Sequence, residues 1–184
     1  MNVEEIAMKI TEEIADKSSR FHNSRKFKKL SNISNVDEDE RGIICNQILI
    51  NGIVLAVLMF ETTAELYNDN TKEHYYRELA LELRNRLRNW AIELGAKEEE
   101  ANKYKDAINA FINDYRNGYK YYKDRFPKFK GTNVWIPIVA ICGFDRITRG
   151  RSSKEDDAYF AIFRNHIGKI ATSITRRARK FRFP

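Results

Sequence analysis

Residues 43–60 read IICNQILINGIVLAVLMF, a run of 18 residues without one charged side chain. The acidic stretch Asp37–Glu40 precedes the run, and carboxylates at the start of a helix favour the positive end of its dipole. We therefore expect one long helix over about residues 37–67. A helix that is apolar all round is buried, either in a protein core or in a membrane. Because the amides of Asn46 and Asn51 would be poorly placed in lipid, we expect a core helix.

Two other structures fit the same run. Its length allows a membrane span, and the dipeptide Asn51-Gly52 is a strong signal for a β-hairpin turn. The rest of the chain offers no convincing strands that would extend a sheet around such a hairpin. It does offer amphipathic helices that need an apolar partner, so we favour the core helix and expect no membrane association.

Helical periodicity runs through most of the remaining chain. The expected helices cover 2–16, with Asn2 as N-cap, then 71–94, 97–125, a short buried helix within 134–144 that has Pro137 in its first turn, and a last helix that opens with the capping box Ser153 and Asp156. Only 8 Gly and 3 Pro leave few obligatory turns. We predict an all-α fold, a compact bundle of five to seven helices. It forms either one domain over 1–184 or two lobes, 1–125 and 134–184.

The composition points to an acidic partner. Lys and Arg number 33 against 26 Asp and Glu, which gives a net charge of +7. The two cysteines, Cys45 and Cys142, are far apart and show no zinc-ligand spacing. The N-terminal stretch is acidic and amphipathic, unlike a secretory signal, so we expect a cytoplasmic protein.

The positive charge is concentrated in acid-poor segments that also contain aromatic rings, namely 17–30, 120–130 and 164–182. Cations hold polyanion backbones, and rings stack on unpaired bases, so this combination favours RNA binding. The cations near helix ends are partly explained by the helix dipole, but the segment 17–30 holds more of them than one helix end needs. The candidate RNA-binding residues are Lys17, Arg20, Arg25, Lys26, Lys28, Lys29, Lys120, Lys123, Arg125, Lys128, Lys130, Arg149, Arg151, Arg164, Arg176, Arg177, Arg179 and Lys180.

No motif for catalysis accompanies these cations. His22, His74 and His166 lack the partners that would make a histidine a metal ligand or a general base, and His166 is expected to border the core. The sequence has no phosphate-binding glycine loop and no nucleophile motif. We expect a protein that is not an enzyme, with no catalytic residue, no metal and no cofactor.

The stretch Asn51–Phe60 resembles a pattern in the small helical subunit of type III-B (Cmr) CRISPR effector complexes. There, Asn-Gly and a Leu/Ala-rich run ending in Phe lie in a core helix. The last helix, 158–180, is similar in kind to that family's C-terminal helix, while residues 95–150 are unmatched. The resemblance implies a non-catalytic subunit in antiviral defence, whose copies stack along the guide RNA. Its partners would be the guide and target strands, the backbone and large subunits, and copies of itself.

Two further classes of function remain open. A DNA-binding regulator or viral accessory protein would carry a helix-turn-helix with a basic second helix, and no convincing short turn between two such helices is evident in the sequence. A purely structural interaction protein would use its cations for acidic protein partners.

Overall fold

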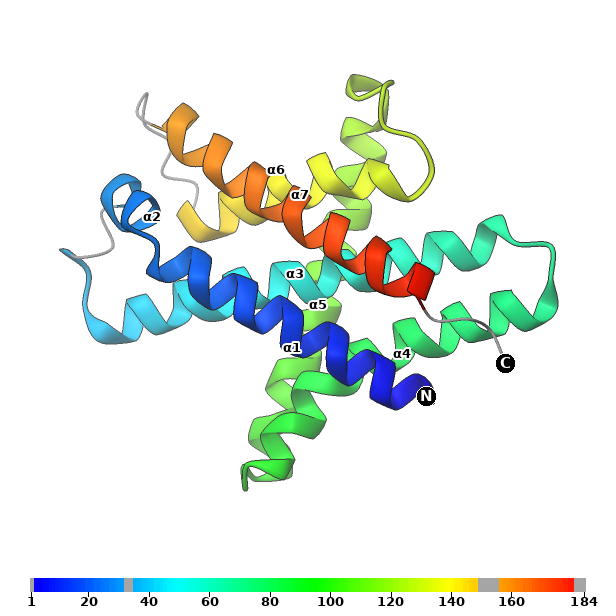
Figure 1. Cartoon of the computed structure of the whole chain (residues 1–184). Coiled ribbons are helices and arrows are strands. Elements are labelled where there is room, and N and C mark those ends of the chain that lie inside the picture. Colours follow the sequence, from blue (N-terminus) through cyan, green and yellow to red (C-terminus); the bar gives the residue numbers. More distant parts are fainter. Residues whose placement is uncertain (1, 32–34, 149–155, 181–184) are drawn as a thin grey trace.

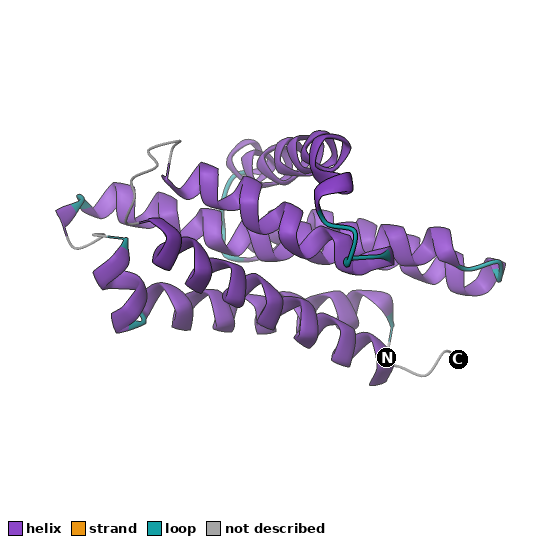
Figure 2. Cartoon of the chain, turned by 90° about the horizontal axis from the view of Figure 1, so that it is seen from above, coloured by secondary structure: helices purple, strands orange, loops and turns teal. Residues whose placement is uncertain are grey.

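The computed structural model describes residues 2–31, 35–148 and 156–180, and these form seven α-helices and no strand. The prediction of an all-α bundle is confirmed (Figures 1 and 2). Two short 3₁₀ helices, η2 (Lys123–Arg125) and η3 (Gly131–Val134), lie between the fifth and sixth α-helices. The α-helices are α1 (Val3–Asn23), α2 (Arg25–Leu30), α3 (Glu38–Leu66), α4 (Asn70–Glu93), α5 (Glu98–Tyr122), α6 (Trp135–Thr148) and α7 (Asp156–Lys180).

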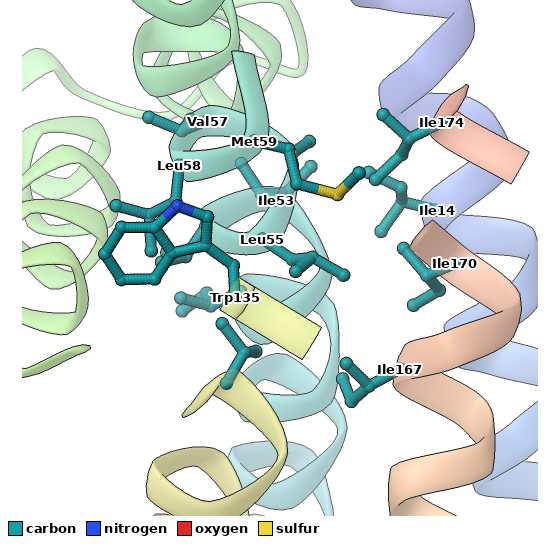
Figure 3. Close-up of a cluster of buried hydrophobic side chains, with 14 of the residues drawn as sticks. Ile14, Ile53, Leu55, Val57, Leu58, Met59, Trp135, Ile167, Ile170 and Ile174 are labelled. Carbon is teal, nitrogen blue, oxygen red and sulfur yellow. The ribbon is translucent and has the colours of Figure 1, made fainter. Parts of the chain in front are cut away.

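The apolar helix α3 is the centre of the fold. It packs against α1, α4, α5, α6 and α7, and every residue from Ile50 to Phe60 is buried. Figure 3 shows Ile14 of α1, Trp135 of α6 and three isoleucines of α7 converging on α3. Among the described residues α3 alone is long and apolar enough to cross a membrane, and most of its apolar stretch is covered by neighbouring helices. That arrangement is typical of the core helix of a soluble protein.

The helix ends show which sequence signals were decisive. Asn2 caps α1 as expected, and its side chain accepts a hydrogen bond from the Glu5 amide at 2.8 Å. The helix runs on to Asn23, well past the expected end at residue 16, so its last two turns belong to the basic segment. Asp69 caps α4, which begins at Asn70, one residue before the expected start. Pro137 lies in the first turn of α6, as predicted, whereas Ser153 lies outside the described residues.

The alternative hairpin at Asn51-Gly52 is wrong, because both residues lie inside α3 and are fully covered. A Cβ atom at Gly52 would collide with Ile14 of α1 and come within 3.2 Å of Ile170 of α7. The glycine therefore allows two helices to approach α3 closely, which is another common reason for a glycine in a helix. Asn51 donates to the Gln47 carbonyl at 2.8 Å and accepts a hydrogen bond from the Tyr115 hydroxyl, so its buried amide is satisfied.

The buried core extends across both of the segments, 1–125 and 134–184, that were considered as lobes. The buried side chains form one continuous cluster, to which α1, α3 and α4 contribute as well as α6 and α7. The helix α3 therefore links both of the segments that were considered as lobes.

A pair of glycine substitutions tests this packing. A Cβ at Gly143 of α6 would lie 2.8 Å from Cγ of Asn51, so alanine there would displace the amide from Tyr115. We expect Gly143→Ala to lower the free energy of unfolding by about 1–3 kcal/mol, although alanine is the better helix former. Gly168 of α7 has nothing within 4 Å of the same position, and Gly168→Ala should stabilise the protein by about 0.5–1 kcal/mol. Urea unfolding of the two variants checks both signs.

Candidate nucleic-acid interface

The helices α1 and α7 run antiparallel, side by side along one side of the molecule (Figure 1). Near one end of the pair, Glu13 accepts hydrogen bonds from the Ser173 hydroxyl and from Nε of Arg177, the latter at 2.6 Å. Near the other end, the ring of Phe21 stacks on His166, with 4.2 Å between the centroids and 9° between the planes. Two segments that are about 150 residues apart in the sequence are thereby joined along a common seam.

Ser24 and Phe27 join the short basic helix α2 to the α1–α7 pair. Ser24 ends α1 and begins α2: its amide donates to the Phe21 carbonyl, and its hydroxyl accepts from the Phe27 amide at 3.2 Å. Phe27 is the one buried residue of α2, and its ring packs on Phe21 and Tyr159. Phe27 faces the protein interior, and the four cations of α2 are exposed: Arg25, Lys26, Lys28 and Lys29.

Two hollows follow the seam between these helices. The first, of about 450 Å³, lies between α1, α2 and α7, and the second, of about 690 Å³, continues along α7 toward Arg176. They share Lys17, Asn165 and Lys169 as lining residues, so together they form one groove. We call this the α1–α7 groove. Its cations are Lys17, Arg20, Lys26, Arg164, Lys169 and Arg176.

Most of the groove's positive charge is not neutralised within the fold. Lys26, Lys169 and Arg176 make no ion pair with any carboxylate in the described part of the chain. Arg20 is paired with Asp16 at 2.8 Å, and Lys17 lies 3.9 Å from Glu13. An excess of unpaired, exposed cations along a hollow is the arrangement that attracts a polyanion.

Glu13 is a second carboxylate held tightly beside the groove, in addition to Asp16. Burial acts to raise the pKa of Glu13, but the hydrogen bonds from Ser173 and Arg177 and the charges of Arg177 and Lys17 outweigh it and lower the pKa. Arg177 is therefore engaged in joining α7 to α1, and it is less available to a ligand than Arg176, which is exposed.

His166 lies beneath the groove and is 5% exposed. Burial, together with the charges of Lys169 and Lys17, lowers the pKa of His166 to about 4, so the imidazole is neutral near pH 7. Its Nε2 has no hydrogen-bond partner within the described residues, and the same holds for the buried hydroxyl of Ser18, one turn before His22 on α1. The expectation that His166 borders the core agrees with this burial.

The basic segment 120–130 lies away from the α1–α7 groove. Lys123 and Lys130 border a separate hollow of about 440 Å³ together with Phe129 and Trp135, and it shares no lining residue with the α1–α7 groove. Tyr121 is 66% exposed, and the Arg125 guanidinium lies 5.0 Å from its ring centre. The remaining predicted cations here, Lys120 and Lys128, are exposed and do not line the hollow.

The candidate residues therefore divide into groups. The fold brings Lys17, Arg20 and Lys26 together with Arg164 and Arg176 in one groove, and the 120–130 set lies apart from it. The other predicted cations, Arg25, Lys28, Lys29 and Arg177, line neither hollow of the groove. Arg149 and Arg151 lie outside the described residues, as do the side chains of Arg179 and Lys180.

Two points were missed in the sequence. Lys169, which lines both hollows, was absent from the candidates, although its spacing of seven residues from Ile162 and from Arg176 places all three on one side of α7. The segment 17–30 also contains two helix ends, those of α1 and α2, so the dipole accounts for more of its cations than was expected.

No known protein family, no curated protein and no solved structure matches this chain.

Proposed function

We propose that this protein is a non-catalytic, RNA-binding subunit of a ribonucleoprotein, with the α1–α7 groove as its main contact. The observation that carries the proposal is the convergence of two distant basic segments on one hollow surface, where Lys26, Lys169 and Arg176 lack carboxylate partners among the described residues. Cations without partners in the protein are the ones that a phosphate backbone neutralises.

The groove suits a strand that is held by its backbone. Lysine and arginine ends contact phosphates and carry no sequence information directly, so little base preference is expected. Each phosphate contact releases counterions, and affinity for RNA should therefore fall steeply as salt increases. The exposed Tyr121 and Phe129 beside Lys123 and Lys130 offer a second, smaller contact for unpaired bases.

The placement in a type III-B CRISPR effector complex of the cytoplasm rests on the resemblance of Asn51–Phe60 and of the last helix, 158–180. The first of these is the buried centre of α3, and its Asn-Gly pair has a packing role here. The placement stays a prediction, together with the guide and target strands, the other subunits and further copies of the chain as partners. Repeat–spacer arrays and a large polymerase-like subunit encoded beside the gene would support it.

A salt titration tests RNA binding. The triple variant Lys26→Glu, Lys169→Glu and Arg176→Glu, which reverses the three unpaired cations of the groove, should bind single-stranded RNA at least about tenfold more weakly at low salt. The slope of log affinity against log salt should fall by about 2, since each lost phosphate contact on a single strand accounts for roughly 0.7. Fluorescence anisotropy with several unrelated sequences measures both quantities, and the loss should be similar for all of them.

The matched control reverses three exposed lysines at the far end of the α4–α5 hairpin, Lys97, Lys103 and Lys105. It changes the net charge by the same amount but leaves the α1–α7 groove intact. If both triple variants lose affinity equally, binding depends on net charge and not on this groove. A parent protein whose RNA binding ignores salt would contradict the proposal itself.

A DNA-binding regulator is the second candidate, because the structure contains the short turn that was not evident in the sequence. The single residue Ser24 separates α1 from the basic α2. With six residues α2 is about 9 Å long, which is short for a helix that reads the major groove. The same titration with duplex DNA separates the two functions: tighter binding to duplex than to single strands would favour the regulator.

A further inference from the structure

The hollow of the α1–α7 groove that lies between α1, α2 and α7 has the size of a ligand pocket. Its volume of about 450 Å³ lies within the range of about 300–1,000 Å³ that is typical of small-ligand sites. Three helices enclose it, since α1, α2 and α7 all contribute lining residues. Contacts to the backbone of a strand need only an open channel, whereas a hollow of this volume also has room for a base.

The pocket has an apolar floor and a cationic rim. Phe21 and Ile162, both half-buried, supply the floor together with His166. Lys17, Lys26 and Lys169 stand around the rim, and Asn165 is exposed there with no hydrogen bond to another described residue. The amide of Asn165 thus offers both a donor and an acceptor at the mouth of the pocket. Ser24 and the Asp16–Arg20 ion pair complete the lining.

His166 is the most buried residue of this lining. This side chain lines the pocket, is 5% exposed, and keeps a buried Nε2 without a partner among the described residues. Buried polar atoms are nearly always hydrogen-bonded, and this atom is an exception among the described residues. The Phe21 ring stacked on His166 fixes the imidazole in this position.

From these features we infer that the pocket receives one nucleotide unit, an unpaired base with its adjoining phosphate. The base lies against Phe21 and Ile162, and the phosphate is held by Lys26 and Lys169 at the rim. A planar aromatic base fits an apolar floor, and a phosphate fits a rim of lysines, so a nucleotide satisfies both at once. This inference rests on the proposed function, because it makes the pocket the place where a bound strand turns one base inward.

A substitution that fills the pocket without changing its charge tests the inference. Asn165→Trp places a large side chain at the mouth of the pocket from an exposed helical position. We expect it to weaken binding of a single-stranded RNA decamer about tenfold, toward the lower end of what one base contact contributes. The salt slope should stay unchanged, since no phosphate contact is removed. Asn113→Trp, at an exposed position of α5, is the matched control and should bind like the parent.

A second measurement separates a base from a bare anion, and a strand from a free nucleotide. Adenosine 5′-monophosphate should shift the backbone amide NMR signals of Ile162 and Lys169 in the parent and not in Asn165→Trp. Inorganic phosphate at the same concentration should have a much smaller effect. Equal effects of the two compounds would mean a site for anions only and would overturn the inference.

The remaining outcomes are also decisive. If the parent binds RNA with a steep salt response and Asn165→Trp binds equally well, the pocket inference fails while the proposed function stands. If the parent binds no RNA, the proposed function fails. In that case, adenosine 5′-monophosphate binding that Asn165→Trp abolishes would assign the pocket to a free nucleotide, and its absence would overturn both.

Discussion

Replacing Phe27 with alanine is expected to lower the free energy of unfolding by about 3–5 kcal/mol. The ring is 0% exposed and packs against Phe21, His22 and Tyr159, so its removal leaves a cavity between α1, α2 and α7. A six-residue helix has no stability of its own in water. Without Phe27 we expect α2 to detach, and RNA affinity to fall although no cation has been removed.

Urea unfolding measures the loss of stability, and amide hydrogen exchange of α2 measures its detachment. Lys28→Ala is the control on the same helix, because Lys28 is exposed and its removal should change stability by no more than about 0.5 kcal/mol. A Phe27→Ala protein as stable as the parent, with α2 amides equally protected, would show that Phe27 does not hold α2 in place.

Lowering the pH from 7 to 4.5 is expected to cost the parent about 2 kcal/mol more stability than it costs a His166→Leu variant. Burial lowers the pKa of His166 from 6.5 to about 4. Between these two pH values the imidazole is protonated in the unfolded chain and neutral in the folded protein. The contribution is fully present above pH 6.5, declines as the pH falls, and is lost by about pH 4. Leucine cannot titrate, and its stability curve should be flatter over this interval.

Chemical denaturation at a series of pH values provides the measurement, with the difference between the two proteins as the readout. Other titrating groups, such as Glu13 and His22, are common to both proteins and cancel in that difference. Ile167→Val, the neighbouring core residue of α7, is the control, and its curve should run parallel to that of the parent. Parallel curves for His166→Leu as well would mean that the folded protein accepts the proton without penalty.

The helices could be predicted from the sequence because each carries its own local signals. The uncharged run 43–60 identified the core helix, and Asn2 and Pro137 marked helix starts correctly. The end of α1 was misplaced because the basic residues after residue 16 do not stop a helix. The helix ends at Ser24, which was not recognised in the sequence as a helix boundary. The Asn51-Gly52 pair illustrates the limit, since a turn signal and a site of close helix approach look alike in sequence.

The candidate site was predictable only as a list of cations. Local sequence gave no indication that Lys26 and Lys169 would border the same pocket, because that depends on how α1 and α7 pair. Nor did it separate Arg176, which is exposed to a ligand, from Arg177, which is bound to Glu13. Adjacent residues of one helix face different ways, and the pairing partner decides which of them is free.

The antiparallel pairing of α1 with α7 has a consequence for the protein during its synthesis. The groove is lined by residues from both ends of the chain. Lys17 and Lys26 are synthesised early, and Asn165 and Lys169 follow more than a hundred residues later. A growing chain that has released α1 and α2 still lacks the other wall of the pocket. The nascent protein therefore has no complete groove until α7 emerges. On the proposed function, it cannot bind its own messenger RNA in this groove before then.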